Sequence, residues 1–377
     1  MKILIAIDSF KGSMTSVIAG NAAATGIRRV FPDADIVVKP IADGGEGTVE
    51  SLVQGLHGEI KKVTVKNPLG NDITAEYGII GDNAVIEMSA ASGIALIPRE
   101  ELSPMNTTTY GVGQMILDAA QNGCKNFIIG IGGSSTNDCG IGMLQALGYD
   151  FIDSEGRSVG YGAKYLSEIK TIDASRVNPL IKDCKFSIAC DVTNPLYGPN
   201  GCSEIFSPQK GATPEEVKLM DAGMISFSET VKKYYSKANP DYPGSGAAGG
   251  LGFAFMTFLD GDLKSGIELI LDKISIEKEI SDSDLVITGE GKIDSQTVMG
   301  KAPIGIARLA KKHGKPVIAF SGCVSRDANV CNSHGIDAVF PIVRTPCTLS
   351  DAMDEENAKN NMADCVEQVM CLIRLKC

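Results

Sequence analysis

An apolar strand, a glycine-rich turn and a helix follow one another at both ends of this chain, and this pattern constrains the fold most. "KILIAIDSF" at the N-terminus is a continuous apolar run, typical of a strand buried on both faces of a parallel sheet, and "SVIAGNAAATGIRRVF" has helical spacing. The plan recurs in "ADIVVKPIADGGEGT" with "TVESLVQGL", and later in "DLVITGEGKID", "APIGIARLAKKHG" and "KPVIAFSGCV". We therefore predict an α/β domain with a parallel sheet, formed by both ends of the chain.

The middle of the chain has a different character. "KKVTVKNPLGNDITAEYGIIGDNAVIEMSA" alternates polar and β-branched residues around turn sequences, which predicts antiparallel strands. A buried strand at "NFIIGIGG" and a long helix with Thr213 as N-cap and Pro214 at its first position follow. We predict a discontinuous domain of residues 1–60 and 246–377, an inserted α/β domain of residues 61–245, and a cleft between them.

Composition excludes several classes of function. The formal net charge is -11 over 377 residues, and no cluster of Lys or Arg offers a face for nucleic acid. The 11 cysteines are odd in number and irregularly spaced, and there are only three histidines, which disfavours a zinc cluster and indicates reduced thiols. Asp8 interrupts the first apolar run, and no run reaches the length of a membrane span. We expect a cytoplasmic protein without a membrane partner, and the sequence leaves its oligomeric state open.

Five segments combine glycines, small polar residues and carboxylates where a strand is predicted to end. They are "DSFKGSMTS", "ADGGEGT", "GIGGSSTNDCG", "ACDVTNPLYGPNG" and "TGEGKIDSQTVMGKAP". Ligands of open α/β sheets bind outside the carboxyl ends of the strands, where glycine lets backbone N–H groups approach a phosphate. Carboxylates would repel that phosphate unless a cation such as Mg²⁺ lay between them. The carboxylates are Asp8, Asp43, Glu46, Asp138, Asp191, Glu290 and Asp294.

Each of these loops, taken alone, also fits ordinary turn chemistry. Asp8 could cap the next helix, and Asp191 could satisfy N–H groups of an Asx-turn. Lysines set among the glycines offer point charges for phosphate or a substrate carboxylate, although a solvated surface explains any single one; they are Lys11, Lys210, Lys292 and Lys301. "GEGKIDSQTVMGK" departs from a Walker A loop because Ala302 follows its "GK", and no nucleophile–histidine pair indicates a hydrolase.

Together, these segments resemble the ordered motif set of the bacterial glycerate kinase family, class I, the glycerate 2-kinase type. "SPQKGAT" and "PGSGAAGGLG" complete the set, and the resemblance covers essentially the whole chain. Cys139, Ser207 and Ser245 depart from the residues expected there. The resemblance implies a flavodoxin-like domain with an inserted restriction-endonuclease-like domain. It also implies ATP- and Mg²⁺-dependent phosphorylation of D-glycerate, with 2-phosphoglycerate favoured over 3-phosphoglycerate.

Roles for individual residues remain hypotheses. Asp191, which ends a buried strand, is the leading candidate for the base that accepts the substrate hydroxyl proton, and Asp294 is the alternative. Lys11 would neutralise charge on the transferred phosphoryl group or bind the glycerate carboxylate. Candidate metal contacts are Asp8, Asp43, Glu46 and Glu290. Candidate contacts to substrate or phosphate are Asp8, Ser9, Lys11, Gly132, Gly133, Ser134, Asn137, Asp138, Asn194, Lys210, Gly289, Gly291, Lys292, Gln296 and Lys301.

Three other functions remain open at this point. A kinase acting on another small hydroxy acid would use the same loops. A nucleotide-dependent oxidoreductase fits the strand–glycine–helix units but leaves the extra carboxylates without a role. A non-catalytic binding module fits a two-domain cleft, and it predicts ligand-stabilised melting without turnover.

Overall fold

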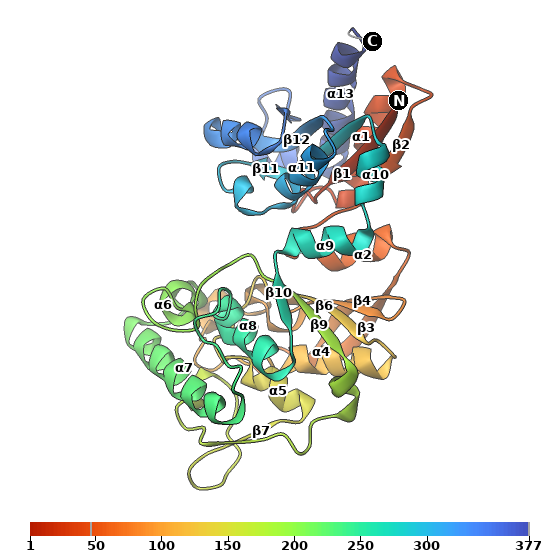
Figure 1. Cartoon of the computed structure of the whole chain (residues 1–377). Coiled ribbons are helices and arrows are strands. Elements are labelled where there is room, and N and C mark those ends of the chain that lie inside the picture. Colours follow the sequence, from red (N-terminus) through yellow and green to blue (C-terminus); the bar gives the residue numbers. More distant parts are fainter. Residues whose placement is uncertain (46, 376–377) are drawn as a thin grey trace. The chain divides into compact units, whose positions relative to one another are not determined.

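The chain is described by a computed structural model that covers residues 1–45 and 47–375, and it divides into two compact units (Figure 1). The terminal unit comprises Met1–Asp43, Glu50–His57 and Ile267–Cys377. The inserted unit comprises Gly44–Val49 and Gly58–Gly266. The fold class predicted from the sequence, α/β with a parallel-sheet region built from both chain ends, is confirmed. The domain boundaries at residues 60 and 245 stay a prediction.

The terminal unit contains a five-stranded, wholly parallel sheet. Its strands are β1 (Lys2–Ile7), β2 (Asp35–Val38), β11 (Leu285–Ile293), β12 (Val317–Val324) and β13 (Ala338–Pro341), in the spatial order β13-β12-β11-β1-β2. Numbered within the unit, this order is 5-4-3-1-2, the flavodoxin-like arrangement. The order reverses between β1 and β11, so this unit carries its topological switch point there.

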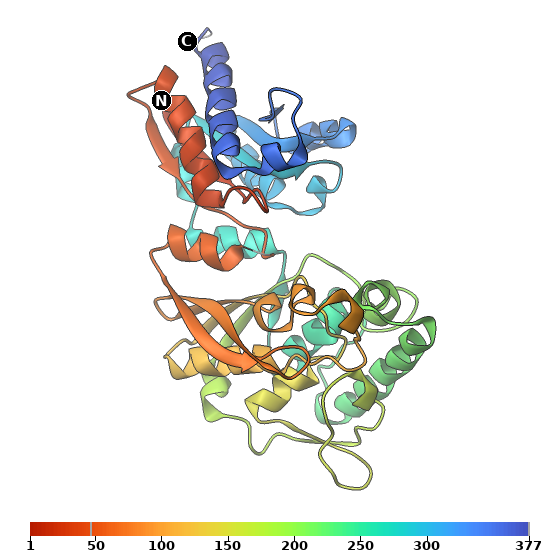
Figure 2. The same cartoon turned by 180° about the vertical axis from the view of Figure 1, so that it is seen from behind.

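Helices cover both faces of this sheet, which is why its central strands begin with apolar runs such as Ile3–Ile7 of β1 and Leu285–Ile287 of β11. Ile3, Ile5 and Ile7 pack in one core with residues of α1 and α13, two helices from opposite chain ends that lie side by side (Figure 2). α10 and α11 contact the strands as well. Fully burying one such side chain contributes about 1.5–3 kcal/mol. The helices are α1 (Ser16–Val30), α2 (Thr48–Gly55), α9 (Gly266–Ile274), α10 (Glu277–Asp282), α11 (Ala302–Lys312), α12 (Leu349–Met353) and α13 (Glu355–Arg374).

The inserted unit contains a six-stranded mixed sheet in the order β10-β9-β6-β5-β4-β3. β3, β4 and β5 are antiparallel, as the alternating pattern predicted, and β5, β6, β9 and β10 run parallel. The β3–β4 turn is closed by Asn67, whose Oδ1 accepts the N–H groups of Leu69 and Asn71 at 2.9 Å each. The strands are β3 (Glu59–Lys66), β4 (Asp72–Ile80), β5 (Asn83–Glu87), β6 (Asn126–Gly130), β9 (Lys185–Ala189) and β10 (Asp262–Lys264); a separate pair is β7 (Asp150–Ile152) and β8 (Thr171–Asp173).

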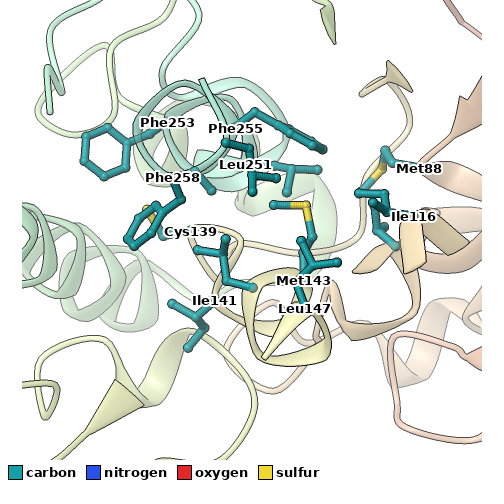
Figure 3. Close-up of a cluster of buried hydrophobic side chains, with 14 of the residues drawn as sticks. Met88, Ile116, Cys139, Ile141, Met143, Leu147, Leu251, Phe253, Phe255 and Phe258 are labelled. Carbon is teal, nitrogen blue, oxygen red and sulfur yellow. The ribbon is translucent and has the colours of Figure 1, made fainter. Parts of the chain in front are cut away.

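A buried apolar cluster joins the helices of the inserted unit to its sheet (Figure 3). Aromatic residues of α8 (Ala247–Phe258) meet Ile141, Met143 and Leu147 of α5 (Ile141–Leu147), with Met88 and Ile116 close by. The other helices are α3 (Ser89–Ser92), α4 (Tyr110–Gln121), α6 (Cys202–Phe206) and α7 (Pro214–Tyr234). α7 begins with the predicted cap: Thr213 and Glu216 form a reciprocal capping box.

The first turn of α8 is irregular, because Ala248, Gly249 and Gly250 have φ values of +50°, +66° and +89°. A Cβ on Gly249 would lie 2.2 Å from the Thr136 carbonyl oxygen, so only glycine allows this close approach. The segment therefore packs directly on the loop that follows β6. Cys139 in that loop also adopts φ +51°, a conformation that favours the glycine expected there by resemblance.

Within the described ranges, no helix combines the length and apolar character needed to cross a membrane.

Candidate functional site

A pocket of about 420 Å³ opens at the carboxyl end of the terminal unit's sheet. It is lined by the last residues of β11 and β12, by residues that follow β1 and β13, and by residues of α12 and α13, and it thus includes the switch point between β1 and β11. The strand order explains why loops so far apart in sequence meet here. Its polar lining residues are Asp8, Ser9, Lys11, Ser13, Asp43, Glu290, Lys292 and Lys301.

Asp8 is the most deeply buried carboxylate of this pocket, with only 5% of its surface exposed. The strand ladder holds its backbone, because its N–H donates to the Gly289 carbonyl at 2.9 Å. Its Oδ1 accepts the Ser9 N–H at 2.6 Å. Burial raises the pKa of Asp8 to about 8, and the nearby carboxylates of Asp43 and Glu290 act in the same direction. Without a cation the Asp8 carboxyl is therefore mostly protonated at neutral pH, and a bound cation would favour its ionised form.

Glu290 lies on β11 beside the same pocket and is also buried. Its Oε1 accepts the Thr297 hydroxyl at 2.8 Å, and its Oε2 accepts Lys301 Nζ at 3.2 Å. Burial raises the pKa of Glu290, although Thr297 and Lys301 oppose this. Lys301 stays partly exposed at the pocket wall, so its charge is available to a ligand.

Lys292, which is exposed, pairs with Asp294, which is largely buried, at the end of β11. Lys292 Nζ lies 2.9 Å from Asp294 Oδ2, and the Gln296 N–H donates to Asp294 Oδ1 at 2.9 Å. The bond from Lys292 lowers the pKa of Asp294 and keeps it ionised at neutral pH. Lys292 lines the pocket; among the described residues, the lining does not include Asp294, Gln296 or Gly289.

Two glycines of this region have different uses. A Cβ on Gly289 would lie 2.1 Å from the Phe320 carbonyl oxygen, so glycine permits the close approach of neighbouring strands. A Cβ on Gly291 would make an ordinary contact of 3.5 Å with Phe10 Cα, and Gly291 itself lines the pocket.

The donor set fits a hard cation only with help from a ligand. Asp8, Asp43 and Glu290 supply carboxylate oxygens, whereas Glu46 lies outside the described residues. In the part of the chain that is described, no group of three or more His, Cys, Asp or Glu side chains is arranged to hold a metal ion. Mg²⁺ in phosphate sites is often bound by one or two carboxylates, with phosphate oxygens and water completing its shell. The pocket's oxygens suit that mode rather than an all-protein cage.

A second group of predicted residues gathers in the inserted unit, at the carboxyl ends of β5, β6 and β9. Parallel pairing places Glu87, Gly130 and Ala189 in register, so the loops after these strands share one edge. Gly132 and Gly133 are exposed there, and Ser134 is half-buried. A Cβ on Gly132 would meet nothing within 4 Å. The backbone of this loop is open to an approaching anion.

Asp138 is fully buried and serves its own loop. Its Oδ2 accepts the Thr109 N–H at 2.8 Å, the Thr109 hydroxyl at 2.9 Å and the Gly142 N–H at 3.3 Å, while its Oδ1 accepts the Gly140 N–H at 3.1 Å. Burial raises its pKa, and these donors oppose the shift. The carboxylate thus fastens the start of α4 to the start of α5, and this geometry favours an organising role.

Lys210 is also buried beneath the same loop, with 2% of its surface exposed. Its Nζ donates to the Ser134 hydroxyl and to the Thr136 carbonyl, both at 2.7 Å. Burial lowers the pKa of Lys210 to about 8. Asn137 is anchored in the same way, because its Nδ2 donates to the Ser203 hydroxyl at 2.9 Å. The side chains of Lys210 and Asn137 hold the loop from inside.

Asp191 lies exposed just after β9, at the edge shared with the Gly132 loop. Its Oδ1 accepts the Gly266 N–H at 3.0 Å and the Ser265 hydroxyl at 3.3 Å. Asn194 is partly buried, and its Nδ2 donates to the Asn200 carbonyl at 2.9 Å. The inserted unit therefore combines an exposed carboxylate with an open glycine backbone.

Sequence reasoning missed several residues of the terminal-unit pocket. Thr297 orients Glu290, and Ser13 lines the wall, although both lie inside quoted motifs. The apolar wall residues Phe10, Ile342, Val343, Leu349, Ala352 and Met353 were not singled out either. Their residue types carry no mark that separates a pocket wall from an ordinary core.

A flavodoxin-like sheet with carboxylates and lysines at its switch point, in a chain with an inserted α/β unit, defines an α/β protein with a site suited to a charged ligand. The model of the glycerate kinase family matches residues 3–374, and the chain belongs to that family. It is a phosphotransferase with an alcohol group as acceptor.

Individual relatives agree over the full length. The chain is 46% identical to a glycerate kinase of Haemophilus influenzae across 100% of both chains. It is 48% identical to a glycerate 2-kinase of Escherichia coli K12 across 93% of each. A crystal structure of a chain named as glycerate kinase 2 from Salmonella typhimurium LT2 superposes with a TM-score of 0.92 at 42% identity, covering 100% of this chain and 99% of that one.

Proposed function

We propose that this chain transfers the terminal phosphoryl group of ATP to D-glycerate in the presence of Mg²⁺, with 2-phosphoglycerate as the product. The observation that carries the proposal is the terminal-unit pocket, where buried Asp8 and Glu290 lie beside Asp43, Lys11 and Lys301. Phosphoryl transfer depends on positioning and charge stabilisation, and this combination of oxygens and ammonium groups supplies both. The names of the relatives from H. influenzae and E. coli support the acceptor and the 2-position.

The terminal unit would hold the charged phosphates. Mg²⁺, when bound by oxygens of Asp8, Asp43 and Glu290, would neutralise charge on the transferred group. Lys11 and Lys301 would add point charges to the same phosphates. Ser9, Gly291 and Lys292 are at the wall and are proposed as further phosphate contacts.

The inserted unit would supply the acceptor side of the reaction. The open backbone of Gly132 and Gly133, with Ser134, is proposed to bind the glycerate carboxylate or a phosphate oxygen. Asp191 is proposed as the base that accepts the hydroxyl proton, because it is exposed at the same sheet edge. Asp294 remains the alternative: its lowered pKa keeps it ionised and so able to accept a proton, but it lies outside the described pocket lining.

We also propose a cytoplasmic location. Every cysteine in residues 1–375 is a free thiol, as expected in a reducing compartment. ATP and D-glycerate are the small-molecule partners in this proposal.

The test is turnover followed by phosphorus NMR. Purified chain, ATP, Mg²⁺ and D-glycerate should yield a glycerate-dependent phosphate monoester. A proton-coupled doublet identifies the 2-phosphate, because C2 carries one hydrogen, whereas a triplet identifies the 3-phosphate. Asp191→Asn and Asp294→Asn, assayed in parallel, assign the base by which variant loses turnover. If ATP remains intact with folded protein, the acceptor is wrong, and a panel of hydroxy acids then tests the kinase itself.

A further inference from the structure

We propose that the terminal-unit pocket is a complete nucleotide site, in which the side near β12 and β13 binds the base and the side near β1 and β11 binds the phosphates. The apolar side is formed by Phe10, Ile342, Val343, Leu349, Ala352 and Met353. The identity of the nucleotide as ATP rests on the proposed function; the division of the pocket into two sides does not.

Size and lining exclude glycerate as the ligand that fills this pocket. A volume of about 420 Å³ is within the range of sites for drug-sized molecules, which have apolar walls and a few convergent polar groups. A three-carbon hydroxy acid is far smaller and has polar groups on every carbon. It would leave the apolar wall uncovered, whereas a nucleoside triphosphate has an apolar ring at one end and charge at the other.

The sheet order separates the two sides of the pocket. Asp8 and Lys11 follow β1, and Glu290 lies on β11. Ile342 and Val343 follow β13, two strands away from β11. Ile342 and Val343 are therefore set apart from Asp8 and Glu290 along one cavity, while Met353 lies close to Gly12 in the loop after β1.

Phe10 extends the apolar side back toward the switch point. A Cβ on Gly322 would lie 3.6 Å from Phe10 Cδ1, so the ring lies over a position of β12 that lacks a side chain. A Cβ on Gly291, the neighbouring glycine of β11, would lie 3.5 Å from Phe10 Cα. Because Gly291 and Gly322 have no side chains, they leave room for the Phe10 ring, on which we propose that the nucleotide base lies.

Two further features fit a bound nucleoside. Ser13 lines the pocket, and its buried hydroxyl oxygen has no hydrogen-bond partner in the described structure. A ribose or phosphate oxygen would satisfy it. Leu349 lies on the pocket wall with 76% of its surface exposed, although it is a large apolar residue. Covering it with a base would remove apolar surface from water.

The first experiment measures binding without turnover. A non-hydrolysable ATP analogue is titrated by calorimetry into wild type, Ala352→Phe and Ser350→Phe. Ala352 is half-buried on the pocket wall, whereas Ser350 is exposed on the same helix and is not part of the described lining. Ala352→Phe should raise the Kd for the analogue at least 10-fold and leave the KM for glycerate unchanged. Ser350→Phe should change neither, and unchanged analogue binding in Ala352→Phe would overturn the proposal.

A second experiment separates the two sides of the pocket. Cys323 is an exposed thiol on the wall, and Cys347 is an exposed thiol outside the described lining. Alkylation of both is followed by peptide mass spectrometry. The analogue should slow labelling of Cys323 at least 5-fold and leave labelling of Cys347 unchanged.

A third experiment tests which side of the pocket binds the base. Adenosine and inorganic triphosphate are titrated separately into wild type and Ala352→Phe. If Ala352→Phe loses adenosine binding but keeps triphosphate binding, the apolar side binds the base; loss of triphosphate binding alone would overturn this assignment.

These measurements fail independently of the proposed function. Suppose that glycerate is phosphorylated, but Ala352→Phe does not change analogue binding and the analogue does not slow Cys323 labelling. The nucleotide then binds elsewhere, and only the pocket assignment is wrong. If the analogue protects Cys323 but no hydroxy acid is phosphorylated, the pocket assignment holds and the reaction is wrong. Protection by a nicotinamide dinucleotide but not by ATP would overturn the kinase assignment of the pocket.

Discussion

The pocket of the terminal unit and the Gly132 loop of the inserted unit share one sequence pattern but treat their charges in opposite ways. Both follow buried parallel strands and combine glycine with a carboxylate; Lys11 belongs to the first loop, whereas Lys210 reaches the second from a distant segment. In the pocket, Asp8 is surrounded by other carboxylates, and Lys11 and Lys301 line an open space. In the loop, Asp138 and Lys210 are buried and bonded to the loop itself.

The difference between Asp138 and Asp8 shows that a carboxylate at the end of a strand can either stabilise its own loop or contact a ligand. Asp138 accepts four hydrogen bonds from three residues, so its charge is used to fix backbone geometry. The Asp8 carboxyl accepts the Ser9 N–H and lines the pocket, where a bound cation would favour its ionised form. Replacing Asp138 should therefore lower mainly the stability of the protein, and replacing Asp8 should lower mainly its activity.

The largest effect is expected from Asp138→Ala. The change leaves the N–H groups of Thr109, Gly140 and Gly142 buried without their acceptor, and each unpaired group costs about 1–3 kcal/mol. We expect the free energy of unfolding to fall by about 4 kcal/mol. Urea unfolding followed by circular dichroism measures this, since the chain contains no Trp. A loss below about 1 kcal/mol together with lost activity would place Asp138 among the ligand contacts and break the comparison.

Asp8→Asn should show the reverse pattern. The amide keeps an acceptor for the Ser9 N–H but removes a charge that the neighbouring carboxylates disfavour. We expect kcat/KM to fall about 100-fold, equivalent to about 2.7 kcal/mol, while the free energy of unfolding stays within about 1 kcal/mol or rises. Asp33→Asn, an exposed change in the same unit, serves as the control and should alter neither quantity. A strongly destabilised Asp8→Asn would show that the carboxylate is structural.

The sequence was sufficient to predict the strands and the carboxyl-end loops, because both depend on local patterns. Continuous apolar runs marked β1, β11 and β12, and alternation marked β3 and β4. The role of Lys210 was not predictable in this way, since its partner Ser134 lies 76 residues away in sequence. Asp138 and Thr109 are 29 residues apart. Whether a charged group faces its own loop or a cavity is decided by such distant contacts.

The apolar side of the pocket illustrates the same limit. Ile342 and Met353 belong to segments that were recognised as strand and helix, but their residue types also suit a core. Only the sheet order brings the end of β13 to the same edge of the sheet as the ends of β1 and β11. Resemblance to a family supplied the reaction class, and the apolar wall emerged from the three-dimensional arrangement.

A third effect concerns pH and the buried lysine. The pKa of Lys210 is lowered to about 8 from 10.5, so between these values the unfolded chain binds more protons than the folded one, and stability rises with pH. Wild type should therefore gain stability relative to Lys210→Met by on the order of 2 kcal/mol between pH 8 and pH 10. Urea unfolding at several pH values measures the difference. Parallel pH dependences would mean that Lys210 remains charged in the fold and contacts a solvated anion.

The smallest effect is expected from Gly132→Ala, which tests whether the loop is open to a ligand. The added Cβ meets no protein atom within 4 Å, so the free energy of unfolding should change by less than about 0.5 kcal/mol. The methyl group would occupy space next to the exposed backbone, and we expect the KM for glycerate to rise about 10-fold, equivalent to about 1.4 kcal/mol. Gly133→Ala is the matched contrast: its φ of +71° makes alanine strained, so it should lose about 1 kcal/mol of stability. If Gly132→Ala leaves the KM unchanged, the acceptor does not approach this backbone, and the inserted unit's loop serves its own fold alone.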